Sequence, residues 1–391
     1  MTAPLLARRT ADIQPFHVME LLRRARELEA QGRDIIHMEV GEPDFPTPPP
    51  IVEAAQRFLA GGDVHYTAAL GLPALREAIA RFYRERFGAE VAPERIVVTA
   101  GASGALMLAL AATTDPGDEW LLPDPGYPSN RHLVRGFEGV ARALAVDAGS
   151  RYQPTPGQVD AAWGPRTRGL MVATPSNPTG TLLSGEEIEA LHRVTRARGG
   201  LLLVDEIYQG LTYGVAASTA LSRPALAAAD DLFVVNSFSK YFGMTGWRLG
   251  WLVVPPAYVR EIEKLAQHFF IAPSTPAQHA ALAAFAPATL DLLEARRAEF
   301  AARRDVLLPA LRALGFDIAT EPQGAFYIYA DVSPLADDAE ALARRLIEEA
   351  GVAATPGIDF GHHRAARHLR IAYTTRGERL LEAVERMRRV L

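Results

Sequence analysis

The chain contains no cysteine, and this absence excludes several classes of protein at once. Disulfide-stapled folds, zinc sites built on thiolates, iron–sulfur clusters and enzymes with a cysteine nucleophile all require this residue. No part of the composition requires an oxidising compartment, so we expect the protein to work in the cytoplasm. The N-terminal residues also lack an apolar run of the length found in secretory signal peptides.

Lysine is almost as scarce, because Lys240 and Lys264 are the only two in 391 residues. Every other basic residue of the 41 is arginine, so this protein uses arginine wherever either cation would serve. Arginine stays protonated and cannot form an imine with a carbonyl group, whereas a desolvated lysine amine loses its proton and attacks. A lysine that is retained in such a chain is therefore a candidate catalytic residue.

The chain also lacks a large excess of charge and a membrane-spanning run. Its 41 basic and 46 acidic residues give a net charge of −5, which favours neither nucleic acid nor an anionic membrane surface as a partner. One uncharged stretch, residues 96–114, has 19 residues and reaches the length of a membrane span, but glycines and threonines interrupt it. We interpret it as a strand, a turn and a helix in a globular core.

Continuous apolar runs alternate with helical patterns between residues 70 and 255. Buried strands separated by helices are typical of an α/β protein with a mainly parallel sheet. Outside this region, helices are expected over residues 16–31 and 289–314 and a strand over 34–40. The C-terminal part suits a smaller α/β domain, with strands near 325–331 and 369–373 and helices near 336–350 and 377–390. The apolar runs of the larger region lie at residues 96–99, 169–174, 201–204, 232–235 and 249–254.

Lys240 lies in a loop between two of the predicted strands, in the segment VVNSFSKYFGMTGWRLGWLVV. Open α/β sheets place their ligands at such loops, at the ends of parallel strands. Residues 234–254 include no acid, and Arg248 is their only other cation. Burial there would lower the pKa of the Lys240 amine, which an imine-forming lysine requires. A lysine in an exposed surface loop is the alternative interpretation.

Two features near this lysine could bind an anion. Arg248 offers a bidentate fork for phosphate oxygens. The turn TAGASG, residues 99–104, follows a strand and opens a helix, so its backbone N–H groups and the helix dipole can receive an anion. Each feature taken alone is more often structural.

Polar residues follow two other buried strands. Asp205 ends the apolar run LLLV, so it is either a counter-ion for a buried cation or the N-cap of a helix. The phenol of Tyr208 lies three residues later. Asn177, in ATPSNPTG, either presents its amide to the same pocket or marks a turn.

With these features in this order, the chain resembles the class I aminotransferases, which are pyridoxal-phosphate enzymes of the aspartate-aminotransferase fold. The resemblance extends from VGEPDF at residues 40–45 to LRIAYT at 369–374, and its most specific part is SFSKYFGMTGWRLG. It implies the fold-type-I architecture, with a mainly parallel seven-stranded sheet in a large domain and a smaller α/β domain. The implied division is an N-terminal arm at residues 1–14, a discontinuous small domain at 15–46 and 287–391, and a large cofactor-binding domain at 47–286.

The resemblance also implies how a cofactor would be held. Lys240 would carry pyridoxal phosphate as an imine and move the proton during catalysis, and Asp205 would pair with the pyridine nitrogen. The other implied contacts are Ala102, Ser103, Ser237 and Arg248 at the phosphate, and Tyr127, Asn177 and Tyr208 at the ring.

The implied substrate contacts come from more distant parts of the chain. Arg370 would bind the substrate α-carboxylate, with Gly41 and Asn177 beside it. Tyr66 matches a tyrosine that reaches the cofactor phosphate of the neighbouring subunit. The resemblance therefore implies a homodimer with shared active sites.

The implied reaction is the ping-pong transfer of an amino group between an L-amino acid and a 2-oxo acid such as 2-oxoglutarate or pyruvate. A carbon–sulfur β-lyase or an amine-forming synthase shares the same lysine, aspartate and arginine, so these activities stay open. Two alternatives come from other classes. The first is a serine hydrolase, because the sequence around Ser103, GASGA, nearly matches the nucleophile elbow of that class. The second is a metal enzyme that uses His362, His363 and His368. These histidines belong to no metal-binding motif, so no metal is expected.

The residues expected around the substrate side chain favour a neutral or aromatic donor. Lys264 lies in the solvent-patterned helical segment REIEKLAQ, which leaves arginine to hold any side-chain carboxylate. Ser103 and Gly104 stand where some relatives that take aspartate carry a lysine. The expected apolar or aromatic lining is Ile13, Phe16, Tyr329 and Phe360.

Overall fold

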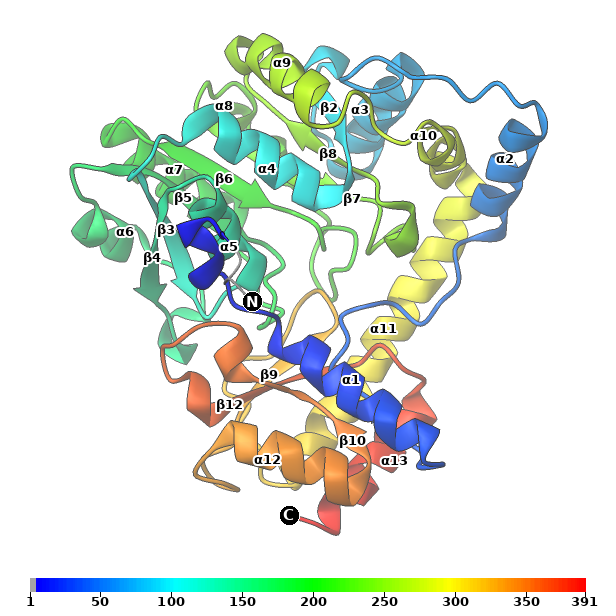
Figure 1. Ribbon diagram of the computed structural model, residues 1–391, viewed down its shortest axis with the longest axis vertical. Helices are drawn as coiled ribbons and strands as arrows, with labels where there is room; N and C mark the ends of the chain where they lie inside the picture. Colours follow the sequence, from blue (N-terminus) through cyan, green and yellow to red (C-terminus); the bar gives the residue numbers. More distant parts are fainter. Residues whose placement is uncertain (1–4) are drawn as a thin grey trace.

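The computed structural model describes residues 5–391, which form an upper part around one large sheet and a lower part around two small sheets (Figure 1). Within these residues, the large sheet has seven strands in the order β2-β8-β7-β6-β5-β3-β4. Neighbouring strands are parallel except that β8 is antiparallel to β2 and to β7. The α/β class and the mainly parallel seven-stranded sheet expected from the sequence are confirmed. The strand bounds are β2 Ile96–Thr99, β3 Glu119–Asp124, β4 Val140–Ala145, β5 Thr167–Ala173, β6 Leu201–Asp205, β7 Leu232–Ser237 and β8 Gly250–Val253.

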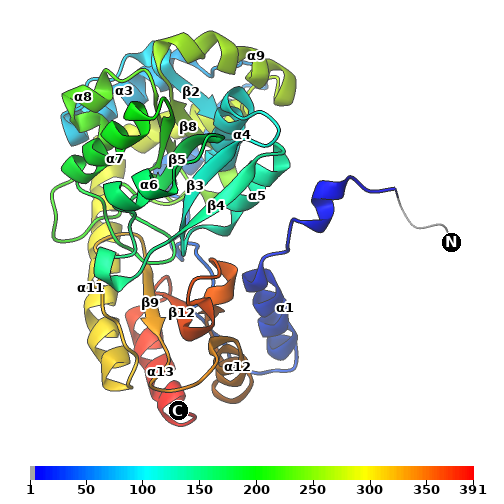
Figure 2. The same ribbon diagram turned by 90° about the vertical axis from the view of Figure 1, so that its left-hand side faces the viewer.

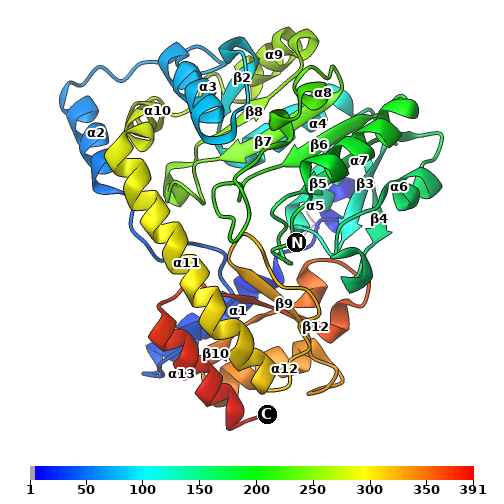
Figure 3. The same ribbon diagram turned by 180° about the vertical axis from the view of Figure 1, so that it is seen from behind.

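Helices cover both faces of this sheet, which explains why its central strands are apolar at nearly every position (Figure 3). Along β6, Leu201 and Leu203 pack among side chains of α4 and α9, whereas Leu202 and Val204 pack on the opposite face. A strand buried on both faces shows no polar alternation. The helices on the first face are α4 Gly101–Thr113, α5 Pro128–Gly136 and α9 Val259–Phe269, and those on the second include α3 Pro73–Phe87, α6 Pro156–Ala162 and α7 Gly185–Ala197.

The lower part brings together segments from both ends of the chain (Figure 2). Strand β1, Ile36–His37, pairs in parallel with β10, Val352–Ala353. The helices expected over residues 16–31 and 289–314 are confirmed as α1 and α11. The strand expected over residues 34–40 is limited to β1, because its partner β10 is equally short. The remaining bounds are α1 His17–Ala30, α11 Pro287–Ala313, β9 Tyr327–Asp331, α12 Ala339–Arg345, β11 Thr355–Pro356, β12 His368–Ala372 and α13 Gly377–Arg388.

Helix α11 runs through both parts, from the region of α2, Pro49–Ala60, and α10, Thr275–Leu282, down to α13 (Figure 3). Domain boundaries at 46/47 and 286/287 therefore stay a prediction. An N-terminal arm is expected at residues 1–14, of which residues 1–4 lie outside the described residues. In residues 5–14, Arg9 Nη1 forms an ion pair with Glu138 Oε1, just after α5, at 3.0 Å. From residue 5 to the C-terminus, no helix has both the length and the apolar character of a bilayer span.

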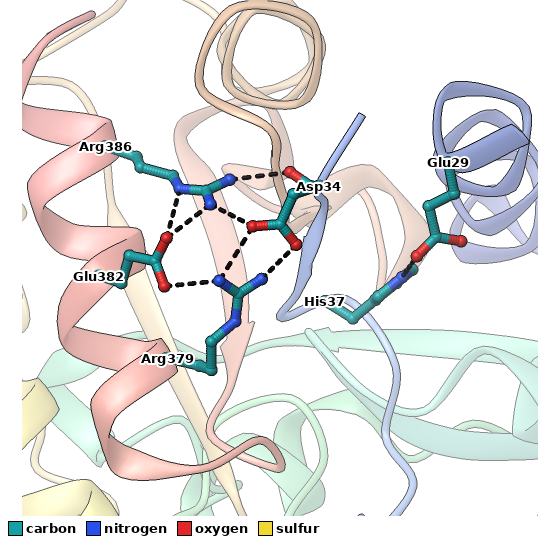
Figure 4. Close-up of polar contacts among 6 residues, drawn as sticks. All are labelled: Glu29, Asp34, His37, Arg379, Glu382 and Arg386. Atoms are coloured by element: carbon teal, nitrogen blue, oxygen red, sulfur yellow. Dashed lines mark hydrogen bonds and ion pairs between the residues drawn. The ribbon is translucent and has the colours of Figure 1, made fainter. Parts of the chain in front are cut away.

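Charged side chains tie the segment before β1 to the C-terminal helix α13 (Figure 4). Asp34 accepts hydrogen bonds from Arg379, with Nη2 to Oδ1 at 2.6 Å, and from Arg386. Glu382 pairs with both arginines from its position between them on α13. The two guanidinium groups hold the pKa of the Asp34 carboxyl below its usual range. Single exposed ion pairs contribute little, but this network joins segments that are far apart in sequence.

Candidate active site

A cavity of about 560 Å³ lies where the carboxyl ends of β5, β6 and β7 meet β9 and β12 of the lower part. Carboxyl ends of parallel strands meet at one edge of a sheet, which is where open α/β folds bind ligands. Among the predicted cofactor contacts, Tyr66 lies elsewhere, with a side chain that is 81% exposed. The predicted residues that line the cavity are Gly41, Ala102, Ser103, Tyr127, Asn177, Asp205, Tyr208, Ser237, Lys240, Arg248 and Arg370.

Lys240 follows β7, and its amine points into this cavity without a carboxylate partner among the described residues. Nζ donates a hydrogen bond to the carbonyl oxygen of Gly41 at 2.6 Å. Burial is the main reason that the pKa of Lys240 is lowered to about 8; Glu42 opposes this shift, and the charges of Arg370 and Arg248 contribute to it. An appreciable fraction of the amine is therefore neutral near pH 7–8, as a nucleophile or a base must be.

Asp205 is a buried acid without a cation. It ends β6, is 4% exposed, and its Oδ1 accepts a hydrogen bond from the backbone N–H of Ile207 at 3.0 Å. No donor within residues 5–391 reaches Oδ2. Burial raises the pKa of Asp205 to about 6, against the effect of the Ile207 hydrogen bond. Such a carboxylate at the wall of a cavity fits a cationic ring nitrogen, which would return it to the ionised state.

The start of helix α4 has the chemistry of an anion site. Its N-cap residue, Ala100, provides no side-chain cap, so the first N–H groups, including those of Ala102 and Ser103, are available to a ligand. Gly101 has φ +70°, and a Cβ on it would lie 2.8 Å from Arg248 Nη2. Glycine thus allows the guanidinium to pack against the turn. With Ser237 also in the cavity wall, this group of donors suits a phosphate dianion.

Arg370 is a buried guanidinium that has no carboxylate partner in the described chain. It projects from β12, and Nη1 donates to Asn177 Oδ1 at 3.1 Å while Nη2 donates to Thr355 Oγ1 at 3.3 Å. Its Nε is buried without an acceptor, and its Cζ lies 4.5 Å from the ring centroid of Tyr327. A guanidinium held by neutral groups alone is suited to bind a carboxylate from a ligand.

Sequence reasoning missed Tyr327, which lies between these groups. Its hydroxyl is 2.8 Å from that of Tyr208, and a Cβ at position 41 would lie 2.0 Å from the Tyr327 hydroxyl. Gly41 is therefore required for close packing. The alternating tyrosines of β9, in YIYAD, were the signal in the sequence, but they do not reveal which tyrosine faces the cavity. Glu42, Ser239 and Thr245, which also line the cavity, were missed as well.

The apolar wall of the cavity is only partly the predicted one. Phe16 and Phe360 line it, whereas Ile13 and Tyr329 do not. Tyr329 lies two residues beyond Tyr327 on the same face of β9, too far along the strand to reach the cavity, and it stacks on His368 with ring centroids 4.5 Å apart. Ile13 lies in the segment before α1 and is 39% exposed. In their place, α1 contributes Val18, Met19 and Leu22.

The features behind the alternative classes serve other purposes. Ser103 lies in the first turn of α4, and the cavity lining, within the described chain, includes no histidine that could activate it. The backbone N–H of His362 donates to Asp124 at 2.9 Å, and His368 Nδ1 contacts the carbonyl oxygen of Arg364 at 2.9 Å. No group of three candidate metal ligands occurs in the part of the chain that the structure covers.

Comparisons with known proteins all find aminotransferases. Residues 33–387 match the family described as aminotransferase class I and II. The chain is 38% identical over 377 residues to a valine–pyruvate aminotransferase of Mycobacterium tuberculosis, with 96% of each protein covered. It is 38% identical over 388 residues to an aspartate/prephenate aminotransferase of Thermus thermophilus, covering 99% of this chain and 98% of that protein. The crystal structure of an aminotransferase from Mycobacterium tuberculosis superposes with a TM-score of 0.95 at 37% identity, covering 100% of this chain and 99% of that chain.

Proposed function

Since the chain belongs to the class I and II aminotransferase family and is an aminotransferase, we propose that it works with pyridoxal 5'-phosphate on a neutral or aromatic L-amino acid and a 2-oxo acid. One observation carries this proposal. Lys240, Asp205 and Arg370 are charged groups that lack an ionic partner within residues 5–391, and all three line one cavity. Three charged groups without partners are unfavourable in a protein unless bound ligands provide those partners.

The residues present fit this cofactor at each of its functional groups. Lys240 would hold it covalently through its amine, and Asp205 would face the ring nitrogen. When bound, pyridoxal phosphate supplies an electron sink for carbanion chemistry at the substrate. The α4 N-terminus and Arg248 would hold the phosphate, with Ser237 beside them. The ring contacts proposed are Tyr127, Asn177 and Tyr208, all of which line the same cavity.

Lys240 is also the proposed base. Its pKa of about 8 leaves the free amine partly neutral at physiological pH, so Nζ can take the proton from the substrate Cα. Arg370 would bind the α-carboxylate through its guanidinium group and orient the substrate, while Asn177 holds the guanidinium in place. The hydroxyl pair of Tyr208 and Tyr327 would close the site on the far side from solvent.

The apolar wall supports a neutral or aromatic donor. Phe16, Met19 and Leu22 project from the start of α1 and the residue before it, and Phe360 lies 4.7 Å from Arg370 Cζ. A side chain attached to a carboxylate on Arg370 would contact this wall, and burial of each CH₂ group there is worth about 0.8 kcal/mol. Higher kcat/KM for leucine or phenylalanine than for aspartate is the expected result, and a strong preference for aspartate would overturn this part.

We propose a homodimer for the active assembly, with Tyr66 reaching the phosphate site of the partner subunit. The side chains of Val64 and Tyr66 are exposed, as are those of Phe269 and Ile271, which lie near them in the fold. A hydrogen bond from Thr275 Oγ1 to the carbonyl oxygen of residue 65, at 2.6 Å, connects the two exposed segments. Neighbouring exposed apolar side chains are typical of an interface. Light scattering should give the mass of a dimer, and Tyr66→Phe should weaken the retention of the cofactor.

We also propose that the protein works in the cytoplasm.

The experiment that tests the function is a single half-reaction without acceptor. The purified protein, supplied with pyridoxal phosphate, is mixed with a panel of amino acids while its absorption spectrum and the products are followed. Loss of the visible cofactor band with one equivalent of 2-oxo acid released is the expected result. Release of ammonia or a thiol with a persistent band would indicate a lyase instead. No visible band at all would contradict the role of Lys240.

A further inference from the structure

The wall of the active-site cavity on α1 belongs to the half of that helix that has no core residues. Met19 and Leu22 line the cavity from this first half, and Phe16 does so from the position before it. The two buried residues of α1, Ala25 and Leu28, both lie in its second half. The helix lies at the outer edge of the lower part (Figure 2). Core packing therefore does not fix the position of this wall.

A carboxylate from the C-terminal part of the chain holds the start of α1. Phe16 occupies the N-cap position without a side-chain hydrogen bond, whereas Asp359 Oδ1 accepts one from the backbone N–H of His17 at 3.0 Å. Among residues 5–391, no other side chain accepts a hydrogen bond from the first turn of α1. Such a carboxylate satisfies an N–H group that has no partner within the helix, and it interacts favourably with the positive end of the helix dipole. Asp359 therefore caps α1 from 342 positions away in the sequence.

Asp359 is itself held in place by contacts on its other sides. It is buried at the end of the turn Gly357–Asp359, and its carbonyl oxygen accepts a hydrogen bond from Arg131 Nη2, in α5, at 2.9 Å. Burial lowers the pKa of Arg131, and the charge of Asp359 opposes that shift. The next residue is Phe360, whose ring centroid lies 4.7 Å from Arg370 Cζ. One short segment therefore connects the wall on α1 with the guanidinium proposed to bind the substrate carboxylate.

We propose that Asp359 is a positioning residue for donor specificity: by capping α1, it holds Phe16 and Met19 where the side chain of a large apolar donor contacts them. This inference rests on the proposed function and adds the residue that sets its donor preference. The side chains of leucine and phenylalanine are long enough to reach this wall from the carboxylate site. The methyl group of alanine is too short, so alanine does not depend on the cap.

The test compares Asp359→Ala with Asp338→Ala in the holoenzyme. Asp338 is matched in its contact, because its Oδ1 caps α12 by accepting from the N–H of Glu340 at 3.0 Å, and it does not line the cavity. The half-reaction at increasing concentrations of leucine, phenylalanine or alanine gives a half-saturating concentration and a limiting rate for each donor. Asp359→Ala should raise the former about fivefold or more for leucine and phenylalanine, but less than about twofold for alanine, and should change each limiting rate by less than about twofold. Asp338→Ala should change none of these values.

Two further variants separate the cap from other effects of the substitution. Asp359→Asn should behave as the wild type, because an asparagine oxygen caps a helix about as well as a carboxylate. His17→Pro removes the N–H group and leaves Asp359 intact. Proline is favoured at the first helical position, and Phe16 already has the extended conformation, with ψ 126°, that precedes a proline. This variant should reproduce the loss for leucine and phenylalanine even if Asp359→Ala does not fold.

Hydrogen exchange gives a readout that is independent of activity. In cofactor-free protein, the amides of residues 17–22 should exchange about fivefold faster in Asp359→Ala than in the wild type, and at the wild-type rate in Asp359→Asn. Unchanged exchange in Asp359→Ala would overturn the inference.

The kinetic measurements provide further ways to refute it. An equal loss for all three donors, or a loss confined to the limiting rate, would show that Asp359 supports only the fold. Wild-type behaviour of His17→Pro, or a loss in Asp359→Asn as large as that in Asp359→Ala, would show that the cap is not the cause. Failure of the half-reaction in the wild type would instead refute the proposed function, whereas a normal half-reaction with an unchanged order of donors in the variants would refute this inference alone.

Discussion

Replacing Asp205 by asparagine should stabilise the cofactor-free protein while removing its activity. The carboxyl group is buried, forms one backbone hydrogen bond and has a pKa raised by burial from 3.8 to about 6. The unfolded chain therefore releases this proton more readily than the folded chain, so ionisation favours unfolding as the pH rises from about 4 to 6. Since one unit of pKa corresponds to about 1.36 kcal/mol, the charge costs about 3 kcal/mol above pH 6.

Urea unfolding of cofactor-free protein measures this effect. At pH 8 the free energy of unfolding of Asp205→Asn should exceed that of the wild type by about 3 kcal/mol, and at pH 5 by about half as much. Asparagine keeps an oxygen for the N–H of Ile207, so the substitution removes only the charge. In the holoenzyme, loss of an ion pair worth about 5 kcal/mol at an effective dielectric of about 20 should lower kcat at least about a hundredfold.

Glu206 provides the matched control, because it is the next residue and is equally buried. Its oxygens accept hydrogen bonds from Thr219 Oγ1 at 2.6 Å and from the backbone N–H of Ala220 at 2.7 Å, and it does not line the cavity. Glu206→Gln should therefore retain amino-group transfer. The reasoning is refuted if Asp205→Asn is no more stable than the wild type at pH 8, or if it keeps wild-type activity.

Three further predictions concern single residues. Lys240→Ala should fold normally by circular dichroism but lose at least about a hundredfold in 2-oxo acid release, and wild-type turnover would contradict its role. Gly41→Ala brings a Cβ to 2.0 Å from the Tyr327 hydroxyl, so kcat/KM should fall about tenfold or more in steady-state assays. An unchanged kcat/KM would show that the Tyr327 side chain can move away without affecting the site. Hydrogen bonding to Glu39 raises the pKa of His37 to about 9, above its unfolded value near 6.5. Glu29, which contacts the other ring nitrogen at 3.1 Å, acts in the same direction (Figure 4). The stabilisation by His37, about 1 kcal/mol after solvent screening, is complete below pH 6.5 and lost as the pH rises through 9; His37→Gln should flatten this dependence in urea unfolding.

The sequence determined the α/β fold and the reactive centre, because both depend on local chemistry. Strands buried on both faces must be apolar at successive positions, so their runs are visible without knowledge of their neighbours. Lys240 stood out because arginine replaces lysine almost everywhere else, and imine chemistry cannot use arginine. Asp205 and Ser237 end neighbouring parallel strands, and such strands meet at one edge of the sheet. Their convergence therefore followed from position alone.

Other parts of the site were decided by how the lower part packs against the sheet. The contacts from Lys240 to Gly41 and from Arg370 to Asn177 join residues 199 and 193 positions apart. Tyr327 and Tyr329 share one face of β9, and only the docking of that strand determines which of them reaches the cavity.

Local pattern determines which residues are apolar, charged or reactive, because those properties belong to the side chain itself. Tertiary packing determines which charges are left without partners, since a partner is defined by distance in space and not by distance along the chain.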